Sequence, residues 1–509
     1  MRKIKAVIGN GLLLTVTSLF LRWLALLFNG YISRKLGAEG VGVYGLVQSV
    51  FGFAITFACA GINLGTTRLI SQSVATDDYS NVKIIIKRCI RYSLFFSITS
   101  LVILFGFSRF IGEGVLGDER TVKSIRVLAI SLPFISCSSV INGYFSAVRK
   151  VYKNAFIMLV EHFVCVWVTV NLFTIITAKS VESACICVAF GTAGSEIISF
   201  LVNCILYAID TRKFDKLGTN EPKNITKKLA EISLPLALSS CFRSGLLTIE
   251  HLLIPYGLRK SGLVYSQSMA VYGIVSGMVF PVILFPACII YAFAGIIIPE
   301  LARLYENKKY DKISAAVSLV LKYTLAFSIG CSAIFICYAY EISNVFYGTS
   351  EAYEYIRLFA PLVSVMYLDS AVDGVLKGLN EQLYSMKINI ADALLSVILV
   401  FALVPVYGIK GYIFTVFVCE IFNCSMSLVR LIKICSLNIS VFSSLLFPLL
   451  CSMGATFAVT FLFDSINITR FNEGGNLAAR IILTGLVYIW LLLSCGFMKR
   501  NKKIPSFNN

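Results

Sequence analysis

The chain has 509 residues, of which 57% are apolar and 14% are charged, and its mean hydropathy is +0.82. Soluble domains are less apolar and carry more charge, so the composition excludes a soluble globular protein and predicts an all-α protein that crosses a membrane many times. We assign the net charge of +18 to the membrane surface, where basic side chains meet anionic lipid head groups. Membrane lipids are therefore expected partners, and nucleic acid is not.

Fourteen apolar stretches are long enough to cross the hydrocarbon layer, which takes about 20 helical residues. The first follows a short basic N-terminus, but its length and the lack of a small-residue cleavage pattern favour a membrane helix over a cleaved signal peptide. The predicted spans are residues 8–32, 41–64, 90–111, 125–147, 155–178, 183–209, 229–257, 267–298, 315–340, 355–379, 386–406, 411–434, 440–463 and 477–498. Little remains for a soluble catalytic domain, so we do not expect an enzyme.

The basic residues predict the orientation of the spans. Of the 45 Lys and Arg residues, 29 fall at the two termini and in every second loop, 13 fall in the opposite loops, and three lie inside spans. Cytoplasmic loops carry the excess of Lys and Arg in membrane proteins. We therefore predict a multi-pass protein of the cell membrane with both termini in the cytoplasm.

The residues that bind metals or cofactors form no recognisable motif. The sixteen cysteines are scattered through apolar spans, and the chain has only two histidines, His162 and His251. Cysteine in this setting behaves as a small apolar residue. We expect no organic cofactor and no metal site other than a site for a coupling cation.

Short sequences recur in the second half of the chain. Val43-Tyr44-Gly45 returns as Val271-Tyr272-Gly273, and Arg22 in the first span is matched by Arg243 in the seventh. An offset of this kind predicts two six-helix lobes related by an axis along the membrane normal. The lobes are residues 1–209 and 229–435, joined by a cytoplasmic linker at 210–228, and residues 436–509 supply two extra helices and a cytoplasmic tail.

Several segments resemble one transporter family. Residues 32–44 read ISRKLGAEGVGVY, residues 61–71 read GINLGTTRLIS, and residues 253–259 read LIPYGLR, with Gly143-Tyr-Phe-Ser between them. This pattern is similar to the stage V sporulation protein B and polysaccharide-flippase family of the multidrug/oligosaccharidyl-lipid/polysaccharide (MOP) exporter superfamily, which also contains the lipid II flippases. The resemblance implies a MATE/MOP-like fold. It also implies a flippase that moves an undecaprenyl-diphosphate-linked oligosaccharide or peptidoglycan precursor by alternating access, coupled to a cation gradient or to the membrane potential.

Arg22 lies in the middle of the first predicted span. A charge at that depth costs about 2.5 to 3.5 kcal/mol even on lenient insertion scales, so it normally faces a water-filled cavity or a partner. Guanidinium groups bind phosphate oxygens bidentately, and we therefore predict that Arg22 and Arg243 hold the diphosphate of the substrate. The alternative is that Arg22 only neutralises an internal acid such as Glu161 or Glu250.

Polar residues elsewhere in the spans suggest two further sites. By similarity to the sodium site of lipid II flippases, Glu250, Asn389, Asp392 and Thr415 are candidate oxygen ligands for sodium, and protonation of a buried acid would serve a proton-coupled cycle equally well. Each of these residues could instead be a packing or hydrogen-bonding group. Candidate polar residues of the substrate cavity are Asn29, Gln48, Asn142, Tyr144 and Glu161.

Two other functions fit the composition less well. A cation-coupled multidrug exporter of the MATE type would place an acid in its first helix, where this chain has Arg22 and no acid. A membrane polymerase or ligase acting on lipid-linked sugars would display a sizeable outer loop, and the predicted outer loops are short. We expect a monomer whose partners are a lipid-linked sugar and membrane lipids.

Overall fold

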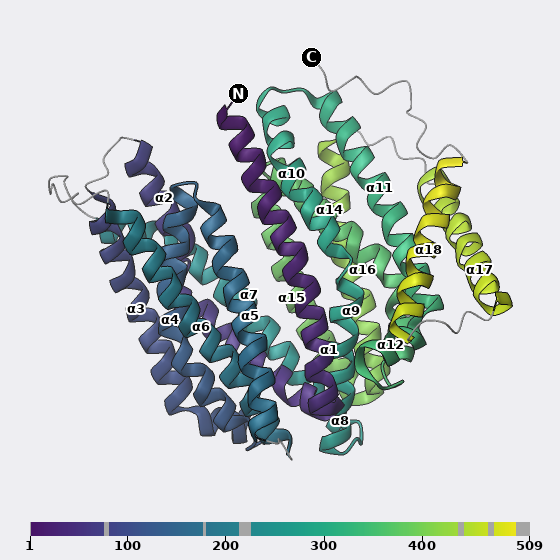
Figure 1. Cartoon of the computed structure of the whole chain (residues 1–509), viewed down its shortest axis with the longest axis horizontal. Coiled ribbons are helices and arrows are strands. Elements are labelled where there is room, and N and C mark those ends of the chain that lie inside the picture. The colour runs from purple at the N-terminus through teal and green to yellow at the C-terminus, as the bar shows by residue number, and fades with distance from the viewer. Residues whose placement is uncertain are drawn as a thin grey trace. The chain divides into compact units, whose positions relative to one another are not determined.

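A computed structural model describes residues 2–75, 81–176, 180–212, 225–435, 442–466 and 473–494. The side chains of residues 2–15, 295–296 and 442–443 lie outside the description. Within the described ranges the secondary structure is entirely helical (Figure 1). Most of the predicted linker, residues 213–224, and the tail from residue 495 lie outside the described residues.

Fourteen helices of the described ranges are long and apolar enough to cross a membrane. The predicted fold class, an all-α polytopic membrane protein with fourteen spans, is therefore confirmed. The candidate spans begin at residues 16, 82, 121, 151, 181, 225, 265, 287, 310, 353, 382, 409, 444 and 473.

The first candidate has 60 residues, Val16–Ala75, and contains both of the first two predicted spans. Helix α1 (Arg2–Cys59) is two helices joined at Gly37, where φ is 70° and ψ is 175°. A side chain other than hydrogen is strongly disfavoured at such dihedral angles, so glycine permits the turn between the two crossings. A second break at Ala60 and Gly61, both with positive φ, separates α1 from α2 (Ile62–Ala75).

The eighth predicted span, 267–298, is interrupted. It consists of α8 (Tyr265–Tyr272), the π-helix η4 (Gly273–Val279), α9 (Phe280–Leu284) and α10 (Ala287–Glu306). Pro281 and Pro286, which lack a backbone N–H donor, lie at the starts of α9 and α10, where that donor is not needed. Pro235 and Pro255, by contrast, lie inside a continuous α7 (Ile225–Lys260).

The chain divides into two compact units. Unit 1 comprises Met1–Phe28, Lys35–Gly273 and Val400–Gly408, and unit 2 comprises Asn29–Arg34, Ile274–Leu399 and Ile409–Asn509. Unit 1 thus holds α7 and α8, which the predicted repeat assigns to the second lobe. Compactness and internal repetition are different criteria, so the two six-helix lobes stay a prediction.

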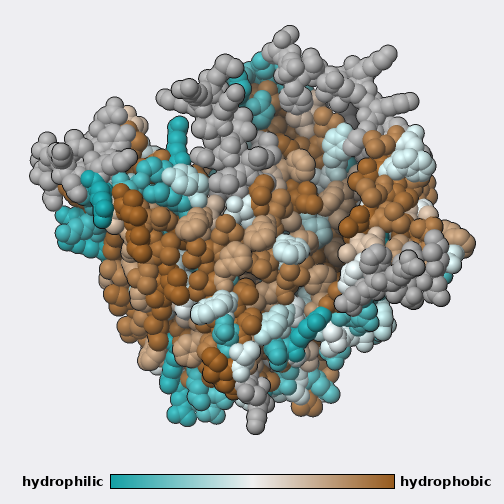
Figure 2. All heavy atoms as spheres, in the orientation of Figure 1, coloured by the Kyte–Doolittle hydropathy of each residue, from teal (hydrophilic) through white to brown (hydrophobic). Residues whose placement is uncertain are grey.

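The other helices of unit 1 are α3 (Val82–Gly106), the π-helix η2 (Phe110–Val115), α4 (Thr121–Ala147), α5 (Val151–Ile176) and α6 (Val181–Thr211). Ile62, Ile86 and Phe145, contributed by α2, α3 and α4, belong to one buried apolar cluster that also includes the start of α7. On the outer face of α3, Phe95, Ile98 and Val102 are at least half exposed. Figure 2 shows this apolar band over the sides of the helices, with hydrophilic residues near their ends, as a membrane-crossing surface requires.

Unit 2 holds the remaining helices, except for the end of α15 from Val400, which belongs to unit 1. They are α11 (Tyr310–Cys337), α12 (Ala339–Tyr347), α13 (Tyr353–Phe359), η5 (Ala360–Leu362), α14 (Val363–Gly378), α15 (Gln382–Tyr407), α16 (Ile409–Ile434), η6 (Phe442–Leu446), α17 (Phe447–Ile466) and α18 (Glu473–Ser494). One core cluster joins α10, α11, α14 and α16. A second joins the last two helices to α11, where the Tyr488 hydroxyl donates to the Ala326 carbonyl at 2.7 Å.

Candidate substrate and cation sites

Arg22 lies on an exposed face of α1 that is separate from the apolar exterior. Val16, Phe20, Trp23 and Leu27 are all at least 40% exposed and follow helical spacing, so they form one apolar stripe. Ser18 and Arg22 are also exposed, but at 3.6 residues per turn they lie roughly 150° around the helix from that stripe. The guanidinium therefore does not share the apolar surface of α1.

Arg243 lies off the main apolar stripe of its own helix. Leu238, Phe242 and Ile249 form an exposed apolar stripe on α7, and Arg243 lies roughly 120° away from it, on a face that also carries Leu247, which is 39% exposed. Arg243 is exposed, and Glu250, seven residues later, lies on the same face. Both predicted phosphate ligands thus belong to unit 1 and are placed off the apolar stripes of their helices.

Two hydrogen bonds align this part of α7 with the second half of α1. The Thr248 hydroxyl donates to the Ser49 carbonyl at 3.1 Å, and the Thr56 hydroxyl donates to the Ser244 hydroxyl at 3.4 Å. Gln48, the residue before Ser49, donates to the hydroxyl of Tyr44 one helical turn earlier, and that hydroxyl lies 3.3 Å from the Thr192 hydroxyl. Gln48 therefore belongs to a polar layer between α1 and α6.

Glu161 lies on α5 and accepts a hydrogen bond from the Ser199 hydroxyl of α6 at 3.2 Å. Glu196 lies one turn before Ser199 on the same face of α6. This carboxylate layer is half-buried within unit 1. A half-buried carboxylate in a span is costly unless it is hydrogen-bonded, neutralised by a partner or open to water.

The structure places the predicted cavity residues Asn142 and Tyr144 in helix packing. Tyr144 is fully buried and donates to an Asp210 oxygen at 2.8 Å, while Lys150 and Lys153 pair with the same carboxylate. The Asn142 backbone carbonyl accepts a hydrogen bond from the Asn154 amide at 3.1 Å, whereas the Asn142 side-chain oxygen is buried and makes no hydrogen bond within the described residues. Tyr144 is therefore committed to Asp210 in this conformation, and we do not retain it as a sugar contact.

Unit 2 brings Asn389 and Asp392 together with a third polar residue. The Asn423 amide of α16 lies 3.4 Å from both the Asn389 carbonyl oxygen and an Asp392 carboxylate oxygen. Asn389 in turn donates to the Ser385 carbonyl at 2.9 Å. Side-chain oxygen atoms of α15 thus meet an amide N–H donor of α16 in one half-buried layer, and carboxylate and amide oxygens are the ligands that hard cations prefer.

Two further acids of α14 extend this layer. Asp373 accepts a hydrogen bond from the Ser385 hydroxyl and pairs with Lys377. Asp369, one turn earlier, has a carboxylate oxygen that is buried and makes no hydrogen bond within the described residues.

The other predicted cation ligands are placed differently. Thr415 is fully buried, and its hydroxyl donates to the Gly411 carbonyl at 2.9 Å. Only the lone pairs of the hydroxyl oxygen then remain to bind a cation or to accept a hydrogen bond. Glu250 lies in unit 1, whereas Asn389, Asp392 and Thr415 lie in unit 2. Asn29, a predicted cavity residue, accepts a hydrogen bond from Ser33 at 3.3 Å.

Asn423 was not among the residues that the sequence suggested. A polar amide in the middle of the apolar stretch 411–434 was the available signal, but it is shared by many packing residues. Asp369 and Asp373 are spaced four apart in a predicted span, which indicates one helix face. Their proximity to α15 depends on helix packing, which spacing does not reveal.

Comparison with known proteins agrees with this architecture. Residues 7–305 match the model of the polysaccharide biosynthesis protein family. Stage V sporulation protein B of Bacillus subtilis (strain 168) is 23% identical over 504 residues, which cover 97% of this chain and 96% of that protein.

Solved structures show the same fold at low sequence identity. The lipid II flippase MurJ in an inward closed conformation gives a TM-score of 0.69 at 13% identity, covering 96% of this chain and 100% of MurJ. An inward-facing multidrug resistance MATE transporter of the MOP superfamily gives a TM-score of 0.63 at 16% identity, covering 81% of this chain and 95% of the transporter. The chain therefore belongs to the polysaccharide biosynthesis protein family, and it is a multi-pass membrane protein with the fold of the MOP superfamily.

Proposed function

We propose that the protein is a flippase that moves an undecaprenyl-diphosphate-linked oligosaccharide or peptidoglycan precursor across the cell membrane. The observation that carries this proposal is the placement of Arg22 and Arg243, two arginines in the middle of spans that lie off the apolar stripes of α1 and α7. The family description, polysaccharide biosynthesis protein, and the fold shared with a lipid II flippase support the same choice.

A diphosphate-linked lipid suits these residues chemically. The diphosphate is the part of the substrate that is most costly to bring into the low-dielectric membrane core. A planar guanidinium donates two parallel hydrogen bonds to phosphate oxygens and stays protonated at any working pH. Two such groups would offset the desolvation of the diphosphate during alternating access, while the apolar tail remains in the bilayer.

The first crossing argues against a cationic substrate. The first acid of the chain is Glu39, which follows the turn at Gly37. A multidrug exporter that recognises cations through its first helix would require an acid before that turn. The positive charge of Arg22 would instead repel a cationic drug.

We propose that the acid and amide layer of unit 2 holds the coupling cation, sodium or a proton. Asp392 supplies the charge, and Asn389 and Asn423 supply or orient neutral oxygens around it. Thr415 remains a candidate ligand from the predicted set, and Asp369 is an additional one, whereas Glu250 of unit 1 is not part of this layer. No organic cofactor and no catalytic residue are part of the proposal.

The substrate proposal predicts a graded loss of affinity at Arg22. Arg22→Lys keeps the charge but loses the planar fork, so it should bind an undecaprenyl-diphosphate sugar several-fold more weakly. Arg22→Ala should lose at least about tenfold, equivalent to about 1.4 kcal/mol. The measurement is binding to folded, monodisperse protein. Lys322→Ala, which removes another basic residue from a span, should change affinity less than twofold.

The same variants separate substrate binding from internal neutralisation. If Arg22 only balances Glu161 or Glu250, Arg22→Ala would leave a buried acid unpaired and would lower the free energy of unfolding by about 3 to 5 kcal/mol. Removing Glu161 or Glu250 as well would then restore the free energy of unfolding. Unchanged lipid affinity in Arg22→Ala, with stability rescued in the double variant, would contradict the substrate role.

The coupling proposal predicts that Asp392→Asn abolishes stabilisation by the coupling ion. A neutral amide cannot balance a bound cation, so the increase in melting temperature that sodium gives the wild type by mass action should disappear. Asp311→Asn is the matched control, because Asp311 is an exposed acid in the first turn of α11. This variant should keep the stabilisation by sodium. A normal sodium response in Asp392→Asn, together with an unchanged pH dependence of transport, would exclude Asp392 as the coupling residue.

A further inference from the structure

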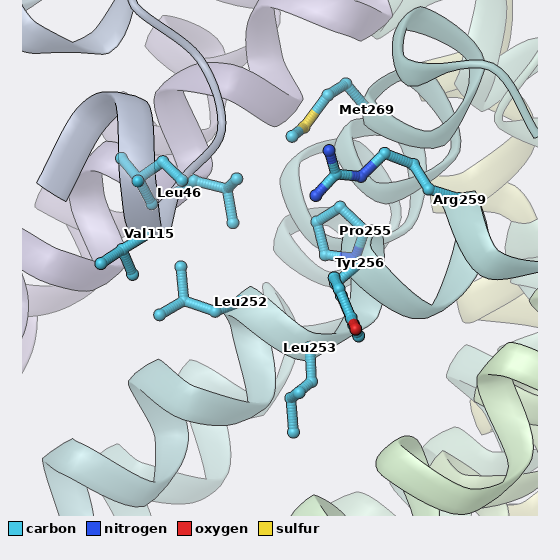
Figure 3. Close-up of a pocket in the computed structure, with 10 residues that line it drawn as sticks. Leu46, Val115, Leu252, Leu253, Pro255, Tyr256, Arg259 and Met269 are labelled. Atoms are coloured by element: carbon cyan, nitrogen blue, oxygen red, sulfur yellow. The ribbon is translucent and has the colours of Figure 1, made fainter. Parts of the chain in front are cut away.

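A pocket of about 280 Å³ lies within unit 1, and neither Arg22 nor Arg243 lines it (Figure 3). Its walls come from the second half of α1, from η2 and the residue after it, from α7 and from α8. The wall residues that carry side chains are almost all apolar, namely Leu46, Val115, Leu116, Leu252, Leu253 and Met269, with Pro255 beside them. Arg259 is the only charged residue of the described wall.

Arg259 extends from α7 into this apolar surrounding. Figure 3 shows its guanidinium directed toward the space between Leu46, Val115 and Leu252. Its Nε is buried and makes no hydrogen bond within the described residues, and its guanidinium carbon lies 5.5 Å from the Tyr265 ring centroid. A buried N–H donor that lacks an acceptor is costly, which makes this position attractive for an anion.

The neighbouring acids have other partners. Asp118 accepts hydrogen bonds from the Arg120 side chain at 2.8 to 3.0 Å and from the Tyr265 hydroxyl at 2.8 Å. Glu39 also accepts from Arg120, at 2.8 Å. No carboxylate of the described residues forms an ion pair with Arg259, so these residues leave the hydrogen-bonding capacity of its Nε open.

The pocket lies at the end of the spans. Arg259 and Lys260 are the last residues of α7, and the η2 segment lies between the candidate spans that end at Gly106 and begin at Thr121. Helix ends of this kind coincide with the interface where lipid phosphates meet the first acyl carbons. At this depth the Arg259 cation matches the phosphate of a phospholipid, and the apolar walls match the first carbons of its acyl chains.

We propose that this pocket binds an anionic bilayer phospholipid, with Arg259 holding the head-group phosphate and the apolar wall holding the first carbons of an acyl chain. The pocket has room for only part of a lipid, because its volume of about 280 Å³ is at the lower end of the range of about 300 to 1,000 Å³ that holds whole drug-sized ligands. It is too small for a lipid-linked oligosaccharide. The site is therefore distinct from the proposed substrate site and does not depend on the proposed function.

The test uses native mass spectrometry of the full-length protein with phosphatidylglycerol, phosphatidylcholine or inorganic phosphate. The wild type should retain phosphatidylglycerol, and Arg259→Gln should retain at least fivefold less. Lys260→Gln is the control, because it removes the adjacent charge. The Lys260 amine lies 5.0 Å from the ring centroid of the wall residue Tyr256, but Lys260 itself is not part of the wall. This variant should change retention less than twofold. Val115→Trp fills the pocket from a 45% exposed position and should also reduce retention at least fivefold.

Each other outcome would overturn the proposal. Equal losses in Lys260→Gln and Arg259→Gln would indicate general attraction to a basic surface. Equal retention of phosphatidylcholine would remove the role of net negative charge in the head group. Binding of inorganic phosphate that Val115→Trp leaves intact would indicate a small-anion site without a lipid. Full retention in Arg259→Gln, with a lower melting temperature in the absence of lipid, would show that Arg259 only contributes to packing, through its contact with the Tyr265 ring.

Discussion

At the scale of single residues, the best-defined polar network of the described chain surrounds Asp118. Its side chain is 5% exposed, and it accepts hydrogen bonds from the Arg120 backbone, the Arg120 side chain and the Tyr265 hydroxyl. Burial alone would raise the pKa of this carboxyl, but the hydrogen bonds and the charge of Arg120 outweigh burial and lower the pKa below its ordinary value. Asp118 is therefore a charged anchor for the loop before α4.

This network predicts a pH-dependent loss of stability in Asp118→Asn. A carboxyl whose pKa is lower in the folded state stabilises the protein above its unfolded pKa of about 3.9, and that contribution disappears as the pH falls through the folded value. At pH 7 the variant should lose about 3 kcal/mol of unfolding free energy, and below about pH 4 the difference should shrink. Melting curves of the detergent-solubilised wild type and variant, at pH 7 and below about pH 4, measure this difference in stability.

Glu119→Gln provides the control for that measurement, because Glu119 is adjacent to Asp118 but exposed. Removing its charge should change the melting temperature by no more than a degree or two at either pH. A constant deficit in Asp118→Asn from pH 7 down to pH 3 would mean that lost packing, and not lost charge, causes the effect.

The sequence identified single residues better than it identified their neighbours. Arg22, Asn389 and Asp392 could be selected because a polar residue in an apolar span is costly and therefore informative. Asn423 and Asp369 could not be assigned to the same layer, since that requires knowing which faces of α14, α15 and α16 meet. The pairing of Tyr144 with Asp210 was missed for the related reason that the two residues lie 66 positions apart in the chain.

At the scale of elements, the second half of α1 and the end of α8 make a very close backbone contact within unit 1. A Cβ atom at Gly42 would lie 2.1 Å from the Met269 carbonyl oxygen, and one at Gly273 would lie 2.2 Å from the Ala38 carbonyl oxygen. Small residues allow membrane helices to approach in this way, because lipid provides no hydrophobic drive for association. Both glycines lie in or beside the repeated Val-Tyr-Gly sequences.

The contact predicts opposite effects for two alanine substitutions in α1. Gly42→Ala must push α8 away and should cost about 1 to 3 kcal/mol, as overpacking does. Gly52→Ala lies in the same helix, but nothing lies within 4 Å of its added Cβ, so it should be neutral or stabilise by up to about 1 kcal/mol through helix propensity. Thermal unfolding of the two purified variants gives the comparison. An equal melting temperature for both would show that α1 and α8 do not touch at Gly42.

Element boundaries were predictable where glycine or proline sets them. The Gly37 turn falls between the first two predicted spans, and Pro286 marks the break in the eighth. The π-helix η4 had no comparable signal, since its residues, Gly-Ile-Val-Ser-Gly-Met-Val, are compatible with an ordinary α-helix. Its register depends on tertiary packing that local propensity does not encode.

At the scale of the whole molecule, the number of crossings depends on two segments. The 60-residue candidate Val16–Ala75 turns at Gly37 and is long enough for two crossings of about 20 residues. The segment 265–306 holds two candidates, but Phe285 and Pro286 at its break both have right-handed helical dihedral angles. The chain bends there without reversing, so we count one crossing. The first candidate therefore counts as two crossings and the two candidates of 265–306 count as one, so the fourteen candidates give fourteen crossings.

An even number of crossings predicts that both termini lie on one side, which the basic residues identify as the cytoplasm. In a variant that lacks all sixteen cysteines, a single cysteine at Ser350 should react with an impermeant maleimide in intact cells. One at Thr219, in the predicted linker and outside the described residues, should react only after permeabilisation. If the segment 265–306 crossed twice, the loop before α13 would move to the cytoplasm while residue 219 stayed there. Protection of both positions in intact cells would therefore refute the single crossing, and the reverse labelling pattern would refute the orientation.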